Sequence, residues 1–249
     1  MNEEPRAFGT AVPPTPLGEP ASSLRWVSDG RPMTEVEAAR QYAREPDPMF
    51  NSPWPVTATL ILLAAVFVGQ IVFGVRAAAE TFGLVPMAVS AGRYEGLLSH
   101  IFLHGGWLHL FFNATALAAF GAPVARLFGS QLGGALRFAV FFLLCGLAGG
   151  LTFWALHPAG AVPLVGASGA ISGLMGAAAR LIERRGTVGH PFSRVALRFV
   201  LPWIVLNLLL AVAGTAFALP IAWEAHLGGL VAGWLLIGPF APQRPRLTS

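Results

Sequence analysis

VTATLILLAAVFVGQIVFGV, residues 56–75, is a run of twenty residues whose only polar members are Thr57, Thr59 and Gln70. A helix needs about 20 apolar residues to cross a hydrocarbon layer roughly 30 Å thick. This stretch is long enough to do so, and it carries no charge. It predicts a membrane-spanning helix, in which every backbone hydrogen bond is made inside the segment itself.

The composition of the whole chain agrees with a membrane protein. Apolar residues make up 55% of the 249 residues, and charged residues make up 11%. An ordinary soluble domain carries roughly 25% charged residues. So few charges cannot cover a soluble fold of this size, and we expect the surplus apolar surface to face lipid.

Further apolar segments follow the first. They are residues 107–124, 136–156, 168–181, 195–217 and 221–240. Together they predict an all-α, polytopic membrane protein with a bundle of six transmembrane helices over residues 54–241. The short segment 168–181 consists mostly of Gly, Ala and Ser, which indicates a helix buried among others. We expect residues 1–53 to form a polar, largely flexible cytoplasmic tail and 242–249 a short second tail.

The basic residues indicate the orientation of the chain. The formal net charge is +4, and all sixteen basic residues are Arg. They lie at segment ends rather than along one face, which argues against a nucleic-acid partner. The connections 125–137 and 180–198 are rich in Arg, so the positive-inside rule predicts cytoplasmic N- and C-termini. No cleavable signal peptide is expected. The Arg-only, Ala- and Gly-rich composition suggests the inner membrane of a bacterium.

Ser168 stands where a loop enters the short helix, with Gly166 and Gly169 on either side of it. The two glycines leave room for a substrate backbone to approach the hydroxyl. A helix N-terminus also offers unpaired N–H groups, which favour a developing oxyanion. Small-residue clusters serve helix packing at least as often as catalysis, so this pattern alone leaves both interpretations open.

His226 is followed by Gly229 and Gly233, three and seven residues later and hence on the same helical face. A Gly-x-x-x-Gly face lets another helix come very close. Packing against the small residues of segment 168–181 would bring the imidazole within the ~3 Å that a general base needs. A purely structural histidine remains an alternative at this point. Glu224 points to another side of the helix and is not expected in the site.

A third polar cluster contains His100, His104, His109 and Asn113. His109 and Asn113 are four residues apart and share a helix face, so both can donate to an oxyanion together with the backbone at Ser168. His104 is expected to brace the preceding loop. His100 and His104 have a spacing compatible with metal binding, but the third ligand and acidic base of a His-Glu-x-x-His site are missing. We therefore expect no metal.

Taken together, the three clusters resemble the rhomboid family of intramembrane serine proteases. The motifs that carry the resemblance are His104-Gly-Gly-Trp-Leu-His109-Leu-Phe-Phe-Asn113, Gly166-Ala-Ser168-Gly169 and Ala225-His226-Leu-Gly-Gly229-Leu230. The resemblance spans roughly residues 54–240.

The resemblance implies Ser168 as nucleophile and His226 as general base, with no acidic third member and no cofactor. It implies an oxyanion hole formed by His109, Asn113 and the Gly166 loop. His100, His104, Gly169, Gly229 and Gly233 are implied as supporting residues. The implied substrates are single-span membrane proteins in the lipid bilayer, cut near the outer end of their helix. Neither the substrate nor the oligomeric state follows from the sequence.

The chain departs from the family pattern at three places. Glu95-Gly96 stands where a Trp-Arg pair is common, and Ala125-Arg126 stands near a usual Glu. Ser172 replaces an aromatic residue that often stacks on the catalytic imidazole. Two other functions are therefore kept as alternatives: an inactive rhomboid-like binder of membrane proteins, and a small transporter.

Overall fold

The computed structural model describes residues 52–182, 187–217 and 221–242, and the two predicted tails lie almost wholly outside these ranges. The long helices are α2 (Trp54–Phe73), α6 (Trp107–Phe128), α7 (Leu132–Leu156), α8 (Ser168–Ala179), α9 (Arg194–Phe217) and α10 (Trp223–Phe240). Short helices fill the connection between α2 and α6: α3 (Val75–Phe82), α4 (Pro86–Ser90), α5 (Gly96–Ser99) and the 3-10 helix η2 (His100–Phe102). The all-α class is confirmed for the described residues.

Each predicted apolar segment corresponds to one long helix, and the largest differences lie at the α6–α7 turn. The sequence predicted ends at Val124 and Leu136, whereas α6 continues to Phe128 and α7 starts at Leu132. The predicted start of α7 left out Gly133, Gly134 and Ala135, and the predicted end of α6 stopped two residues before Arg126. A helix does not have to stop there, since an arginine at its end can extend toward water. Gly129, with φ 92°, terminates α6 instead.

Among the described helices, α2, α6, α7 and residues 194–213 of α9 are long and apolar enough to cross a membrane. The helix α8 has 12 residues, and α10 has 18 residues that include Glu224. The count of six spans therefore stays a prediction.

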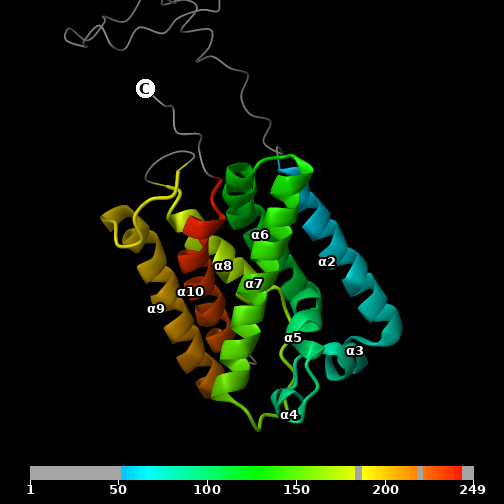
Figure 1. Cartoon of the computed structure of the whole chain (residues 1–249). Helices are drawn as coiled ribbons and strands as arrows, with labels where there is room; N and C mark the ends of the chain where they lie inside the picture. Colours follow the sequence, from blue (N-terminus) through cyan, green and yellow to red (C-terminus); the bar gives the residue numbers. More distant parts are fainter. Residues whose placement is uncertain (1–51, 183–186, 218–220, 243–249) are drawn as a thin grey trace, which may run out of the picture. The chain divides into compact units, whose positions relative to one another are not determined.

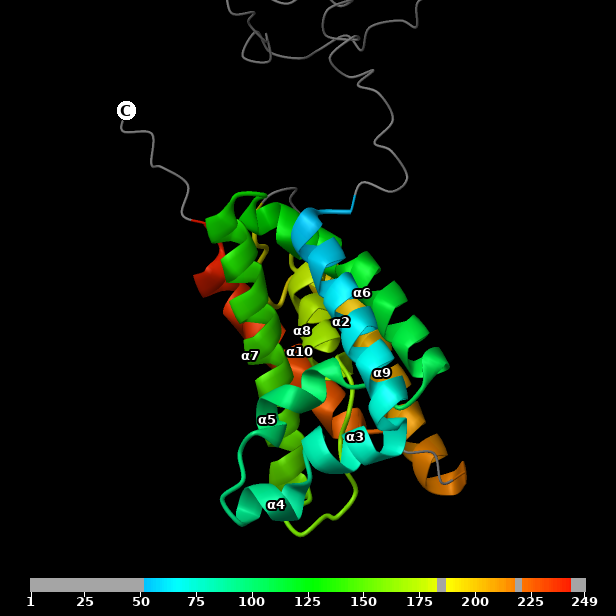
Figure 2. The same cartoon turned by 90° about the vertical axis from the view of Figure 1, so that its right-hand side faces the viewer.

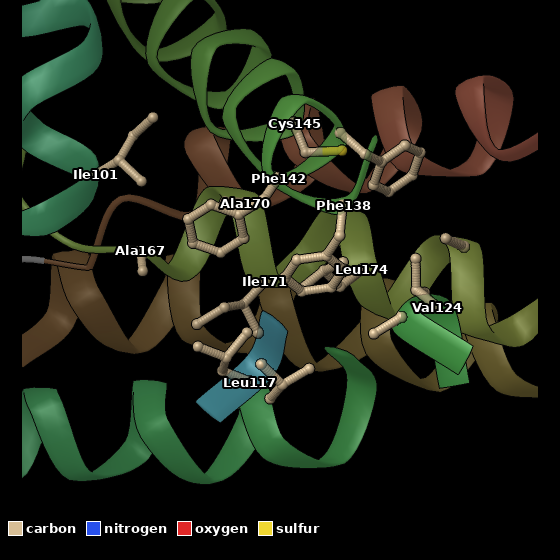
Figure 3. Packing of buried hydrophobic residues seen from close by; sticks show 14 of the residues in the cluster. Ile101, Leu117, Val124, Phe138, Phe142, Cys145, Ala167, Ala170, Ile171 and Leu174 are labelled. Atoms are coloured by element: carbon tan, nitrogen blue, oxygen red, sulfur yellow. The ribbon is translucent and has the colours of Figure 1, made fainter. Parts of the chain in front are cut away.

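Helix α8 lies in the middle of the bundle, in contact with α6, α7, α9 and α10 (Figures 1 and 2). Every residue of α8 after Ser168 is buried. Figure 3 shows Ala170, Ile171 and Leu174 of α8 between the phenylalanines of α7 and Leu117 of α6. The expectation that this segment is enclosed by other helices is confirmed.

Glycines allow α8 and α10 to come into backbone contact. A Cβ on Gly229 would collide with the carbonyl of Gly169, and one on Gly233 with the carbonyl of Gly173. In lipid, apolar side chains gain little by leaving the solvent, so helix association depends on close packing of this kind. The α8–α10 contact is therefore specified by small residues rather than by hydrophobicity.

The segment from α3 to η2 covers one end of the bundle (Figures 1 and 2). The loop before α8 is attached to this segment by backbone hydrogen bonds. Leu84 and Leu164 exchange N–H···O=C bonds of 3.0 and 2.8 Å, and the N–H of Gly166 donates to the carbonyl of His100 at 2.9 Å. These bonds fix the position of the first residue of α8, Ser168.

Candidate active site

Ser168 and His226 meet at the α8–α10 contact. The hydroxyl of Ser168 lies 2.8 Å from Nε2 of His226, within hydrogen-bond distance across 58 residues of sequence. Both side chains are half-buried. The close α8–α10 contact, which leaves no room for side chains at Gly169 and Gly229, brings Ser168 and His226 together, as the sequence predicted.

The other ring nitrogen of His226 contacts Asn207, in the middle of α9. Nδ1 of His226 lies 2.7 Å from Oδ1 of Asn207, and Nδ2 of Asn207 donates to the carbonyl of Trp203 at 2.8 Å. Asn207 is completely buried. The sequence reasoning missed this residue.

His109, at the start of α6, has a defined protonation pattern. The N–H of Gly105 donates to Nδ1 of His109 at 3.2 Å. A neutral imidazole that accepts at Nδ1 carries its proton on Nε2, so this nitrogen is a donor. Nε2–H of His109 is therefore available to donate a hydrogen bond.

Gly166 separates His109 from Ser168. A Cβ at this position would lie 2.8 Å from Nε2 of His109 and 3.7 Å from Oγ of Ser168. The residue has φ 127°, which L side chains rarely adopt. Its own N–H is bonded to His100, so Gly166 contributes to the predicted hole through its missing side chain rather than through its amide.

Asn113 lies one turn after His109 on α6 and is buried. Its Nδ2 donates to the carbonyl of His109 at 2.9 Å, and its Oδ1 has no partner among the described residues. An amide nitrogen carries two hydrogens, so one N–H remains for a substrate oxygen. Because Ile171 makes the first amide bond inside α8, to Ala167, the amides from Ser168 to Ala170 are also not used by the helix.

His100 and His104 support the site from the segment before α6. Nδ1–H of His100 donates to the carbonyl of Gly96 at 2.9 Å. His104 is completely buried, and its ring packs edge-on against His109 with centroids 5.2 Å apart. Burial lowers the pKa of each of these two histidines to about 4, so both are neutral at pH 7. Among the described residues no group of three or more His, Cys, Asp or Glu side chains could hold a metal.

Gln70 is a second residue that the sequence reasoning did not assign to the site. Its Oε1 accepts from the N–H of His104 at 2.9 Å, and its Nε2 donates to the carbonyl of the same residue at 3.1 Å. This pair of bonds fixes the backbone next to Gly105, whose N–H orients His109. A lone buried amide in an apolar span was the signal available in the sequence.

Glu224 is directed away from the imidazole of His226, in agreement with its exclusion from the predicted site. Its Oε1 lies 2.7 Å from Nε2 of His157, at the end of α7. The Glu224 side chain is 8% exposed. The Glu224 carboxylate is therefore buried and hydrogen-bonded at the end of α7.

A serine hydroxyl within hydrogen-bond distance of an imidazole, beside a donor and a helix N-terminus, is an arrangement suited to acyl transfer. The helical fold and these motifs are those of a family of polytopic membrane proteins. The Rhomboid domain family matches residues 91–243, and the chain belongs to this family.

Two curated relatives are similar to this chain. Rhomboid protease GluP of Bacillus subtilis (strain 168) is 33% identical over 147 residues, which cover 59% of this chain and 26% of that protein. RHOMBOID-like protein 5 of Arabidopsis thaliana is 34% identical over 148 residues, 59% of this chain and 44% of that protein. The chain thus spans less than half the length of either relative.

Proposed function

We propose that this protein is a serine endopeptidase that cleaves single-span membrane proteins inside the bilayer. The observation that carries the proposal is the 2.8 Å contact between Ser168 Oγ and His226 Nε2. Membership of the rhomboid family supports it, as does the similarity to a relative named as a rhomboid protease.

In this mechanism His226 Nε2 takes the Ser168 proton while Oγ attacks the scissile carbonyl. The oxyanion that forms accepts hydrogen bonds from Nε2–H of His109, from Asn113 and from the free amides at the start of α8. His226 then gives its proton to the leaving amine, and the acyl-enzyme is hydrolysed by a water that His226 deprotonates. No cofactor takes part.

The proposed location is the inner membrane of a bacterium, with the Arg-rich ends of α6, α7, α8 and α9 in the cytoplasm. Ser168 then lies on the non-cytoplasmic side. The helix α8 has 12 residues and rises about 18 Å. If its C-terminal end lies at the cytoplasmic face, Ser168 at its start lies below the opposite surface of a layer roughly 30 Å thick. Substrates would be cut near the outer end of their span, where small or helix-weakening residues let the strand unwind.

The test is cleavage of a panel of single-span reporters by the purified protein in liposomes, with any cut mapped by mass spectrometry. We expect Ser168→Ala and His226→Ala each to reduce cleavage by several orders of magnitude, since nucleophile and base act as a unit. A fluorophosphonate should label Ser168 in the wild-type protein and in neither variant.

Ser172→Ala is the matched control, because Ser172 lies on the same helix and its buried hydroxyl has no partner among the described residues. It should cleave as the wild type does. Retained cleavage in Ser168→Ala would refute the mechanism. A folded protein that neither labels nor cuts would instead support a membrane-protein binder, and solute flux that survives Ser168→Ala would support a transporter.

A further inference from the structure

The hydrogen bonds of Asn207 settle which way its side-chain amide faces. The carbonyl of Trp203 can only accept, so the amide nitrogen of Asn207 must point toward it, at 2.8 Å. The amide oxygen therefore faces Nδ1 of His226, at 2.7 Å. An oxygen in that place requires the ring to carry its proton on Nδ1.

This tautomer is the one that the proposed chemistry needs. A neutral imidazole protonated at Nδ1 has its lone pair on Nε2, where Ser168 Oγ lies 2.8 Å away. The opposite tautomer would present Nε2–H to the hydroxyl and could not accept its proton. Only one of the two neutral forms of His226 is thus a base toward Ser168.

No large side chain one turn beyond the nucleophile holds the ring. Ser172 occupies that position and is fully buried, and its hydroxyl has no partner among the described residues. Asn207 itself is fully buried in α9, a helix whose leucines and valines are largely exposed in this bundle. Placing an amide there is costly in a membrane unless it serves a specific partner.

We propose that Asn207 is a positioning residue that holds His226 in the tautomer and orientation in which Nε2 accepts the Ser168 proton, so that the site is a Ser–His–Asn triad rather than a dyad. The inference rests on the proposed function for its kinetic consequences, but the tautomer itself can be observed without any activity.

Two substitutions of Asn207 test its two side-chain hydrogen bonds separately. Asn207→Leu removes both the acceptor for His226 and the donor to Trp203. Asn207→Asp keeps an acceptor for His226 and replaces the amide donor to Trp203 with a carboxyl oxygen. We expect Asn207→Leu to lower kcat on the order of 10- to 100-fold with KM unchanged, a part of the roughly 10²–10⁴-fold that general base catalysis contributes. Asn207→Asp should recover most of that loss.

Leu209→Ala, at an exposed position two residues further on in α9, is the control and should keep the wild-type kcat.

The spectroscopic readout is 15N NMR of histidine-labelled protein in nanodiscs, with the His226 signals assigned by their loss in His226→Gln. The wild-type spectrum should show the proton on Nδ1, and Asn207→Leu should show a mixture of tautomers. A wild-type His226 protonated on Nε2 would overturn the inference, as would equal kcat losses in the Leu and Asp variants or none in the Leu variant. A wild-type protein that fails to cut or to label at Ser168 would instead refute the proposed function and leave the tautomer result standing.

Discussion

His109 shows how a single backbone N–H can set the role of a side chain. Gly105 donates to one ring nitrogen, and the other is left as a donor beside the position where a Cβ of Gly166 would lie. The space kept open by Gly166 lies between His109 Nε2 and Ser168 Oγ. A side-chain atom added at Gly166 would clash with the imidazole of His109 and occupy this space.

Gly166→Ala should therefore reduce kcat/KM by about 10²- to 10³-fold, the usual loss when one oxyanion donor is displaced. The new Cβ would lie 2.8 Å from Nε2 of His109, at a backbone φ of 127°. Cleavage of the reporter measures the loss. Gly92→Ala is the control, because Gly92 also has a positive φ, 90°, but has open space around it. Equal losses in both variants would mean that backbone strain, rather than displacement of His109, explains the effect.

Some residues of the candidate site could be predicted from the sequence, and others could not. Ser168, His226 and His109 stand in motifs with fixed glycine spacing, so both their chemistry and their helix faces could be predicted. Asn207 and Gln70 are single amides within apolar runs, and their partners lie 19 and 34 residues away. Periodicity says nothing about which helix such an amide will meet, so these contacts needed the three-dimensional structure.

At the scale of helices, the predicted Gly229 and Gly233 face is correct, but its partner surface is more specific than the sequence indicated. The sequence indicated only the small residues of segment 168–181 as that surface. In the structure the two α10 glycines pack on the backbone carbonyls of Gly169 and Gly173. Contact with carbonyl oxygens depends on the absence of a side chain rather than on side-chain type, which is why polarity could not identify the register.

Gly229→Ala should push α10 away from α8 and lengthen the Ser168–His226 contact. We expect a loss of at least about tenfold in kcat and a lower thermal unfolding temperature in detergent, because the added methyl overlaps the Gly169 carbonyl.

Gly238→Ala is the control: it makes the same change in the same helix, at a position where the nearest atom to the added Cβ is 3.8 Å away. That variant should be as active as the wild type and no less stable, since alanine favours a helix by roughly 0.5–1 kcal/mol over glycine. An active, fully stable Gly229→Ala protein would contradict the packing argument.

At the scale of the whole molecule, the segment from α3 to η2 and the loop before α8 form one hydrogen-bonded unit around His100 and His104. The sequence predicted the helical core well because length and hydropathy alone place long helices. It did not predict α3, α4, α5 or the Leu84–Leu164 pairing, because this segment carries no sustained apolar period and is held by backbone bonds. Such bonds are available to any residue type.

Acid should destabilise the fold through this unit. Burial lowers the pKa of His100 and of His104 from the usual 6.5 to about 4. Between these values the unfolded chain binds protons that the folded chain does not, so stability should be constant above about pH 6.5 and fall as the pH drops toward 4. Each histidine can account for on the order of 3 kcal/mol. Unfolding by SDS titration in mixed micelles at a series of pH values measures this.

His104→Leu should make that fall shallower, since neither ring nitrogen of His104 has a hydrogen-bond partner among the described residues. The free energy of unfolding at pH 7.5 should change little in comparison. A variant with the same pH dependence as the wild type would show that His104 does not bind a proton on unfolding in this range.

The backbone contact between α8 and α10 also has a consequence for biosynthesis. His226 lies 58 residues after Ser168, so the ribosome must add α9 and the first turn of α10 before the two can meet. Until then a growing chain carries Ser168 without His226, and helix α8 lacks one of the neighbours that enclose it. Under the proposed mechanism, the growing chain therefore cannot cut its own earlier helices before α10 is made.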